Sequence, residues 1–185
     1  MRLLAVLAAA ALALSACGGA ATPSPSPTPP PTPSPSPTPE TKFTFLADLK
    51  TTNEVPAIAN AEASCSGKGT FTLDTTKDST GKVTAATAAF DLTVSACPAT
   101  VMLTLFHIHQ APAGTNGGVK VGGKTDAANP IPLPTGATTT PISVKGVAVD
   151  PQLASDIIAG PAGFYFNVHS QLNPGGVIRG QLTKS

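Results

Sequence analysis

Apolar and polar residues alternate along much of the chain beyond residue 41, and this two-residue period is typical of β-strands with one buried face. Residues 42–49 (KFTFLADL) show the pattern clearly. By the same criterion we expect further strands over residues 69–74, 82–94, 100–109, 117–121, 141–149, 163–170 and 177–183. Residues 122–140 are rich in Gly, Pro, Asn and Thr, which predicts an irregular excursion.

A single helix is indicated between two of these strands. Asp150 can cap it, Pro151 suits its first turn, and Gly160, which precedes another proline, ends it. Leu153 and Ile157 would share its inner face. Many short strands joined by turns, with one short helix, predict an all-β fold, either a Greek-key β-sandwich or a flattened barrel.

The first 16 residues have the pattern of an export signal. Arg2 is followed by an apolar run over residues 3–14 and then by small residues, and the run is too short for a permanent membrane span. Residues 14–18 (LSACG) resemble a bacterial lipobox, in which Cys17 receives a lipid and becomes the mature N-terminus. The alternative is ordinary signal cleavage beside an incidental cysteine.

Residues 17–41 predict a disordered linker. Proline alternates there with Ser and Thr, so the segment has little apolar surface to bury and favours an extended, polyproline-like chain. Residues 42–185 remain as a single domain that is long enough for one hydrophobic core.

The composition argues against a nucleic-acid partner. The formal net charge is +1, 11% of the residues are charged, and the chain has one Tyr and no Trp. We therefore expect neither a basic surface nor an aromatic platform for stacking bases. Contact with a membrane is expected only through the lipid on Cys17.

Cys65 and Cys97 remain as an even pair once Cys17 is assigned to the lipid, and in an exported domain this predicts a disulfide. The bond would close a loop of about 33 residues, worth about 3–4 kcal/mol in the chain-entropy model. Two buried free thiols are the alternative. A zinc site of two cysteines and two histidines is not favoured, because the sequence has no C-x-x-C pair.

All three histidines lie in two strand-like segments, FHIH at residues 106–109 and FNVH at residues 166–169. Because a strand alternates faces, His107 and His109 point the same way. If the two segments are neighbours in a sheet, His169 joins them and three imidazoles converge on one face. Such a group suits copper, zinc or nickel and leaves an open coordination position.

Several motifs occur together and in order. They are Asn53-Glu54-Val55-Pro56, residues 69–73 (GTFTL), His107-Ile108-His109 with residues 111–117 (APAGTNG), and Asn167-Val168-His169 with residues 173–182 (NPGGVIRGQL). Together they resemble the chordin-type (CHRD) domain over nearly all of residues 43–183. Chordin itself is an extracellular antagonist of bone morphogenetic proteins. Bacterial members of the family are exported, and the resemblance implies no established activity for them.

The histidine pattern is also similar to that of copper-zinc superoxide dismutases, which are Greek-key barrels with a His-x-His pair on one strand and another copper ligand on a later strand. His107, His109 and His169 look like the counterparts of those three copper ligands, so the resemblance implies copper. Two departures weaken it. The chain has no fourth histidine to bridge copper and zinc. Arg179 falls within the expected last strand, whereas the arginine that guides superoxide in that family precedes it.

Histidines on a strand can instead hydrogen-bond loop carbonyls, and Asn167 and Asn173 can do the same. On this second interpretation the two motifs fix the neighbouring loops to the sheet without a metal. Arg179 is expected to pair with Asp91 or Glu54, or to cover the sheet edge.

The sequence therefore predicts an exported, lipid-anchored CHRD-domain binding protein of the bacterial cell envelope, facing the periplasm or the exterior, with copper at His107, His109 and His169. The first alternative is a metal-independent module that binds an extracellular protein or glycan. The second is a copper-only superoxide dismutase. An enzyme is less favoured because neither a Ser-His-Asp order nor a pair of catalytic carboxylates is recognisable.

Overall fold

The computed structural model describes residues 41–98, 100–133 and 141–185. Its strands are β1 (Lys42–Lys50), β2 (Ser66–Lys77), β3 (Val83–Ser95), β4 (Met102–Gln110), β5 (Gly118–Lys124), β6 (Ile131–Pro132), β7 (Ile142–Val149), β8 (Phe164–Ser170), β9 (Ile178–Gln181) and β10 (Thr183–Lys184). The described helices are α1 (Pro151–Ala159) and two 3-10 turns, η1 (Thr51–Asn53) and η2 (Pro161–Gly163). The predicted signal peptide, Cys17 and most of the predicted linker lie outside the described residues.

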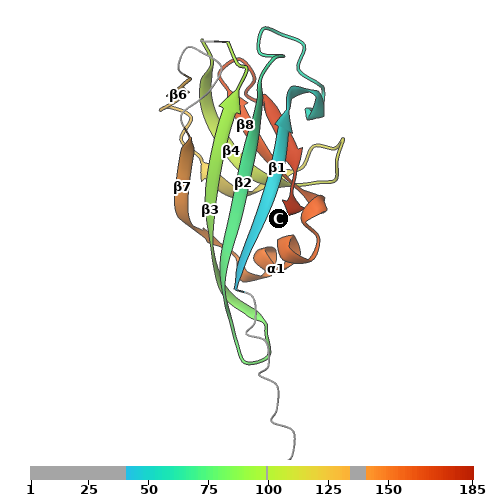
Figure 1. Ribbon diagram of the computed structural model, residues 1–185, viewed down its shortest axis with the longest axis vertical. Coiled ribbons are helices and arrows are strands. Elements are labelled where there is room, and N and C mark those ends of the chain that lie inside the picture. Colours follow the sequence, from blue (N-terminus) through green and yellow to red (C-terminus); the bar gives the residue numbers. More distant parts are fainter. Residues whose placement is uncertain (1–40, 99, 134–140) are drawn as a thin grey trace, which may run out of the picture. The chain divides into compact units, whose positions relative to one another are not determined.

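The strands form one antiparallel sheet in the order β5-β4-β8-β9-β1-β2-β3-β7, with β10 paired to β1 and β6 paired to β4. The sheet folds over, so that β1, β2 and β3 lie in front of β4 and β8 (Figure 1). Its two end strands, β5 and β7, come into contact. The predicted all-β flattened barrel with one short helix is confirmed.

Phenylalanines fill the space between the two layers. Phe71 contacts Phe90 edge-on with ring centroids 5.0 Å apart, and Phe90 reaches Phe106 at 5.8 Å and Phe166 at 5.6 Å on the opposite layer. All four rings are at most 1% exposed. Because Phe106 and Phe166 point into the core, the residues next to them on β4 and β8 face outward.

Helix α1 begins as predicted. The Asp150 carboxylate accepts the N–H groups of Gln152 at 2.9 Å and Leu153 at 3.0 Å. Ala154 and Ile157 are fully buried, whereas Leu153 is half-buried beside the core. The helix covers one end of the barrel (Figure 1).

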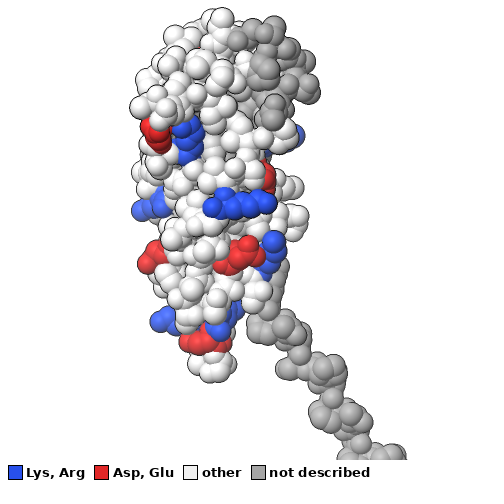
Figure 2. Space-filling view, turned by 90° about the vertical axis from the view of Figure 1, so that its left-hand side faces the viewer, with Lys and Arg blue, Asp and Glu red and all other residues white. Residues whose placement is uncertain are grey.

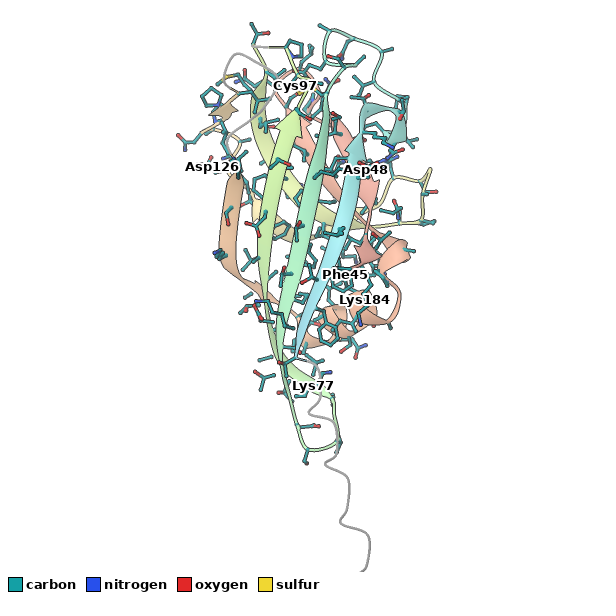
Figure 3. The ribbon with its side chains drawn as sticks, viewed as in Figure 1. Phe45, Asp48, Lys77, Cys97, Asp126 and Lys184 are labelled. Atoms are coloured by element: carbon teal, nitrogen blue, oxygen red, sulfur yellow. A yellow bond between two sulfur atoms is a disulfide. The ribbon has the colours of Figure 1, made fainter. Side chains whose placement is uncertain are left out.

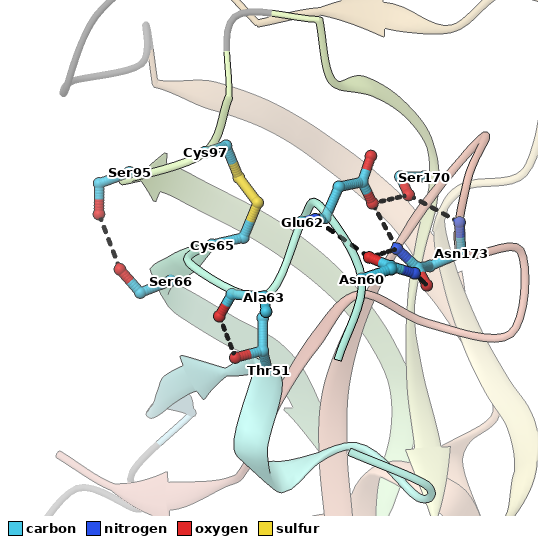
Figure 4. Close-up of a disulfide and its surroundings, with 10 residues drawn as sticks. All are labelled: Thr51, Asn60, Glu62, Ala63, Cys65, Ser66, Ser95, Cys97, Ser170 and Asn173. Atoms are coloured by element: carbon cyan, nitrogen blue, oxygen red, sulfur yellow. Dashed lines mark hydrogen bonds between the residues drawn. A yellow bond between two sulfur atoms is a disulfide. The ribbon is translucent and has the colours of Figure 1, made fainter. Parts of the chain in front are cut away.

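Cys65 and Cys97 form the predicted disulfide. They lie just beyond the pair formed by Ser66, the first residue of β2, and Ser95, the last residue of β3. The hydroxyl oxygens of this pair are 3.2 Å apart (Figure 4). Cys97 lies at the opposite end of the sheet from Lys77 (Figure 3). The bond therefore ties the segment before β2 to the end of β3.

The structure differs from the sequence prediction at two places. β5 continues to Lys124 and β6 pairs with β4, both within the stretch expected to be irregular, of which residues 134–140 lie outside the described residues. The predicted last strand is divided into β9 and β10, because the N–H of Leu182 donates to Phe164 O at 2.9 Å and the chain then pairs with β1.

Charges of both signs are interspersed on the surface. Figure 2 shows Lys and Arg alternating with Asp and Glu on the face that it presents. Some of these opposite charges form exposed ion pairs, such as Lys68 Nζ with Asp48 Oδ1 at 2.6 Å. Within the described ranges no helix has the length and apolar character to cross a bilayer.

Candidate metal centre

The three histidines lie on two neighbouring strands. In the antiparallel pair of β4 and β8, His107 lies opposite Asn167 and His109 lies opposite Tyr165. His169 follows Asn167 by two residues on β8, so it points to the same side. Their sequence neighbours fill the core, and the three imidazoles share the outer face of the sheet, as predicted.

The imidazole rings converge. Their centroids are 5.0 Å apart for His107 and His169, 5.6 Å for His107 and His109, and 5.9 Å for His109 and His169. One nitrogen of each ring lies within 4.8 Å of the other two. Two nitrogens bound to one metal at about 2.1 Å are at most about 4.2 Å apart, so ring movements of about half an ångström close the group around an ion.

Loop carbonyls fix two of the rings. His109 Nδ1 lies 3.0 Å from Gly117 O, and His169 Nδ1 lies 2.9 Å from Pro174 O. A carbonyl oxygen can only accept, so each Nδ1 carries the proton and each Nε2 of the neutral ring keeps a lone pair. Metal-binding histidines usually have this arrangement, because an oxygen that accepts from the outer N–H orients the ring.

His107 offers the third nitrogen. Its Nδ1 lies 3.3 Å from His169 Nε2, and since the latter has a lone pair, His107 donates this hydrogen bond. The separation also falls within the range of about 2.9–3.6 Å expected for two nitrogens bound to one metal. If His107 carries its proton on Nε2 instead of Nδ1, its Nδ1 has a lone pair, and a metal ion can take the place of the hydrogen between His107 Nδ1 and His169 Nε2.

Two glycines let the loops approach the histidines closely. A Cβ at Gly117 would lie 2.0 Å from Gln110 O. Gly176 has a φ of 135°, and a Cβ there would lie 2.7 Å from both Glu54 Oε1 and Asn167 Nδ2. Only glycine fits such positions. Under these loops the three histidine side chains are 6–7% exposed.

Burial lowers the pKa of all three histidines. It brings the pKa of His107 to about 4, with a further contribution from repulsion by His169 and His109. Burial is also the main cause of the lowered pKa of His109 and of His169, and in each it outweighs the opposing effect of the hydrogen bond to the loop carbonyl. At neutral pH the rings are therefore uncharged, which is the form that binds metal ions.

Arg179 pairs with Glu54, one of its two predicted partners, rather than with Asp91. Arg179 Nε lies 3.6 Å from Glu54 Oε2, and both side chains are buried. The guanidinium also donates to Asn53 O at 2.6 Å and to Asn116 Oδ1 at 2.9 Å. Burial raises the pKa of Glu54 to about 7, against the lowering effect of Arg179. Arg179 thus fastens two loops to the sheet.

Tyr165 is a site residue that the sequence analysis missed. Its ring stacks on His109 with centroids 4.9 Å apart, and the guanidinium carbon of Arg179 lies 4.8 Å from its centroid. Its hydroxyl accepts the N–H of Gly117 at 3.1 Å. The signal was present, because Tyr165 and His169 are four residues apart on one strand and so share a face.

A family model described as the CHRD domain matches residues 45–182, which include the three histidines, Glu54 and Arg179. The chain belongs to the CHRD domain family. Comparison with curated proteins and with solved structures gives no match. The similarity to copper-zinc superoxide dismutases therefore rests on the residue pattern alone. CHRD domains are typically extracellular, and membership supports an extracellular-type interaction module.

Asn167 and Asn173, the two asparagines expected to fix loops, lie in different surroundings of this CHRD domain. Asn173 donates through Nδ2 to Glu62 Oε2 at 2.5 Å and through its N–H to Ser170 Oγ at 3.0 Å, so it holds the turn after β8 (Figure 4). Asn167 is 2% exposed in the middle of the histidine face, and within the described part of the chain its Oδ1 has no hydrogen-bond partner.

Buried polar atoms without partners gather on this face. Among the described residues they are Glu54 Oε1, His109 Nε2, Asn167 Oδ1 and Arg179 Nη2. Native proteins leave few such atoms unsatisfied, so these four atoms are the places on this face where a bound water, ion or ligand would gain a partner. A cavity of about 390 Å³ borders Pro174 and Gly176, in the loop over His169, and gives an ion or small molecule access to that loop.

Proposed function

We propose that this CHRD domain binds one copper ion through His107, His109 and His169. One observation carries the proposal. His109 Nε2 is buried and has no hydrogen-bond partner among the described residues, while Nδ1 of the same ring is fixed by Gly117 O. An unsatisfied buried acceptor costs about 1–3 kcal/mol, and a metal ion at this lone pair would remove that cost.

The donor set supports copper over zinc. The histidines are the only members of the cluster in the part of the chain that the structure describes, so it contains no thiolate or carboxylate. Nitrogen ligands of this kind bind Cu(II) more tightly than the other divalent ions of the first row. Three ligands also leave a position open to a water or another small ligand.

Copper retention by the purified protein tests this function. After loading with copper and dialysis against a chelator, we expect one copper per chain in the wild type and a large loss in His107→Gln, His109→Gln and His169→Gln. Lys120→Gln, an exposed change on β5, is the matched control. Substoichiometric copper in the wild type, or equal retention in the histidine variants, would contradict the proposal.

A metal-independent interaction module for an extracellular protein or glycan is the second candidate. It is favoured by the family and by two exposed apolar side chains, Val55 and Leu172, which line the cavity of about 390 Å³ beside the loop that contains Pro174. This candidate predicts a melting temperature that does not respond to copper, whereas a ligand that binds only the folded state raises it. A dismutase gains no support, since Arg179 is 3% exposed and bound to loop groups.

We further propose that a lipid on Cys17 holds the domain at the bacterial cell envelope and that residues 17–41 serve as the spacer. The family and the Cys65–Cys97 disulfide support an oxidising compartment outside the cytosol. Cys17→Ser should move the protein from the membrane fraction to the soluble fraction. Unchanged membrane association would contradict the anchor.

A further inference from the structure

Glu62 is a buried carboxylate that has no cationic partner in the described part of the chain. It lies between η1 and β2, is 5% exposed, and takes part in none of the ion pairs found in the described ranges. Its Oε2 accepts from Ser170 Oγ and from Asn173 Nδ2, both at 2.5 Å. Figure 4 shows the other carboxylate oxygen pointing away from these two donors.

Glu62 borders an open cavity of about 350 Å³, which we call the Glu62 pocket. Its other walls are Ala61, Pro98, Thr100, Met102, Gln171 and Leu172. Leu172 is 55% exposed and also borders the cavity of about 390 Å³ beside the loop that contains Pro174. The pocket therefore combines a carboxylate at its wall with apolar side chains around it.

Covalent and backbone bonds hold the walls of the Glu62 pocket in place. The Cys65 N–H donates to Glu62 O at 3.0 Å, and the disulfide joins Cys65 to Cys97, the residue before Pro98. On the opposite side the Gln171 N–H donates to Met102 O at 3.0 Å. A preformed pocket loses little conformational entropy when it binds.

We propose that the Glu62 pocket binds a lysine or arginine side chain of an extracellular partner protein. Burying a carboxylate is costly unless a positive charge compensates it, and here the hydrogen bonds of Ser170 and Asn173 compensate it only in part. The cationic head would meet the free oxygen of Glu62, while its methylene groups would lie against Met102 and Leu172. The proposal does not rest on copper binding at the histidine site.

Two probes of nearly the same shape, one cationic and one neutral, test the proposal. The protein is titrated with acetyl-arginine amide and with its uncharged analogue acetyl-citrulline amide, and backbone amide NMR shifts are followed. We expect saturable shifts at Glu62, Thr100 and Gln171 with the arginine probe, and binding about tenfold weaker or less with citrulline. Equal binding of the two probes, or no saturable shift at tens of millimolar, would overturn the proposal.

Variants separate recognition from folding and from copper. Glu62→Gln keeps an acceptor oxygen for Ser170 and Asn173 but removes the charge, so arginine binding should weaken about tenfold with the remaining spectrum unchanged. Leu172→Ala, at an exposed position, should weaken arginine binding without changing the hydrogen bonds that Ser170 and Asn173 donate to Glu62. His109→Gln should leave arginine binding unchanged. Wild-type affinity in both pocket variants would reject the site whatever the outcome for copper.

Discussion

At the scale of single residues, the histidine site depends on which ring nitrogen carries a proton. Strand alternation placed His107, His109 and His169 on one face, and the structure agrees. The sequence did not reveal that Gly117 O and Pro174 O select the tautomers, because those contacts form only when loops fold back over the sheet. Loop fixation uses Nδ1 of His109 and His169 and leaves Nε2 for a metal ion, so the two alternative roles of these histidines are compatible.

His107 makes the stability of the copper-free protein sensitive to acid. Its pKa is about 4 when folded against 6.5 as the reference, so between these values the unfolded chain binds more protons and the free energy of unfolding falls as the pH falls. His107→Gln removes this loss. Urea unfolding across the window should show the variant gaining stability relative to the wild type as the pH decreases. Parallel curves would contradict the lowered pKa.

Glu54 has the opposite effect on how the free energy of unfolding changes with pH. Its pKa is about 7 when folded against 4.5 as the reference, so the folded protein binds more protons between these values. Its contribution to stability is full below about pH 4.5 and is lost as the pH rises through about 7. Glu54→Gln should therefore become more stable relative to the wild type as the pH increases through this window. Urea unfolding measures the difference, and a constant difference would contradict the raised pKa.

At the scale of elements, local patterns predicted most strands and α1, while tertiary contacts decided the rest. β6 has two residues, Ile131 and Pro132, too few for an alternation to be visible. β8 is buried on both faces, although alternation suggested one exposed face, because loops cover its outer side. Glu62 could not be recognised as buried, since it lies in a loop without a periodic pattern.

The loop over His109 provides a test at this scale. Gly117→Ala places a Cβ 2.0 Å from Gln110 O, so the loop must shift and its carbonyl must leave His109. We expect copper affinity to fall about 10–100-fold, the usual effect of losing such an orienting contact. Gly118→Ala is the matched control, because its Cβ meets no atom of the described residues within 4 Å. Equal copper affinities in a competition titration would show that the carbonyl does not orient the ligand.

At the scale of the whole domain, the histidine site and the Glu62 pocket share one turn. Asn173 donates to Glu62, and the next residue, Pro174, holds His169. The Cys65–Cys97 disulfide fastens the segment that carries Glu62. One covalent bond thus supports the wall of the Glu62 pocket that faces Gln171 and Leu172, the two residues that follow β8.

Removing the disulfide should destabilise the domain. Cys65 and Cys97 are 32 residues apart, so Cys65→Ala with Cys97→Ala should lower the free energy of unfolding by about 3–4 kcal/mol in the chain-entropy model. Urea unfolding of the wild type with and without reductant provides the comparison. A loss well under 1 kcal/mol would show that the bond contributes little to stability.

Pulsed EPR of the Cu(II)-loaded protein tests the copper site most directly, because the remote nitrogens of bound imidazoles are counted individually. The chain has three histidines in all, so every imidazole signal comes from the proposed ligands. We predict three equatorial or near-equatorial imidazoles in the wild type and two in His109→Gln. A spectrum with one imidazole or none, or one unchanged by His109→Gln, would contradict a copper centre at His107, His109 and His169.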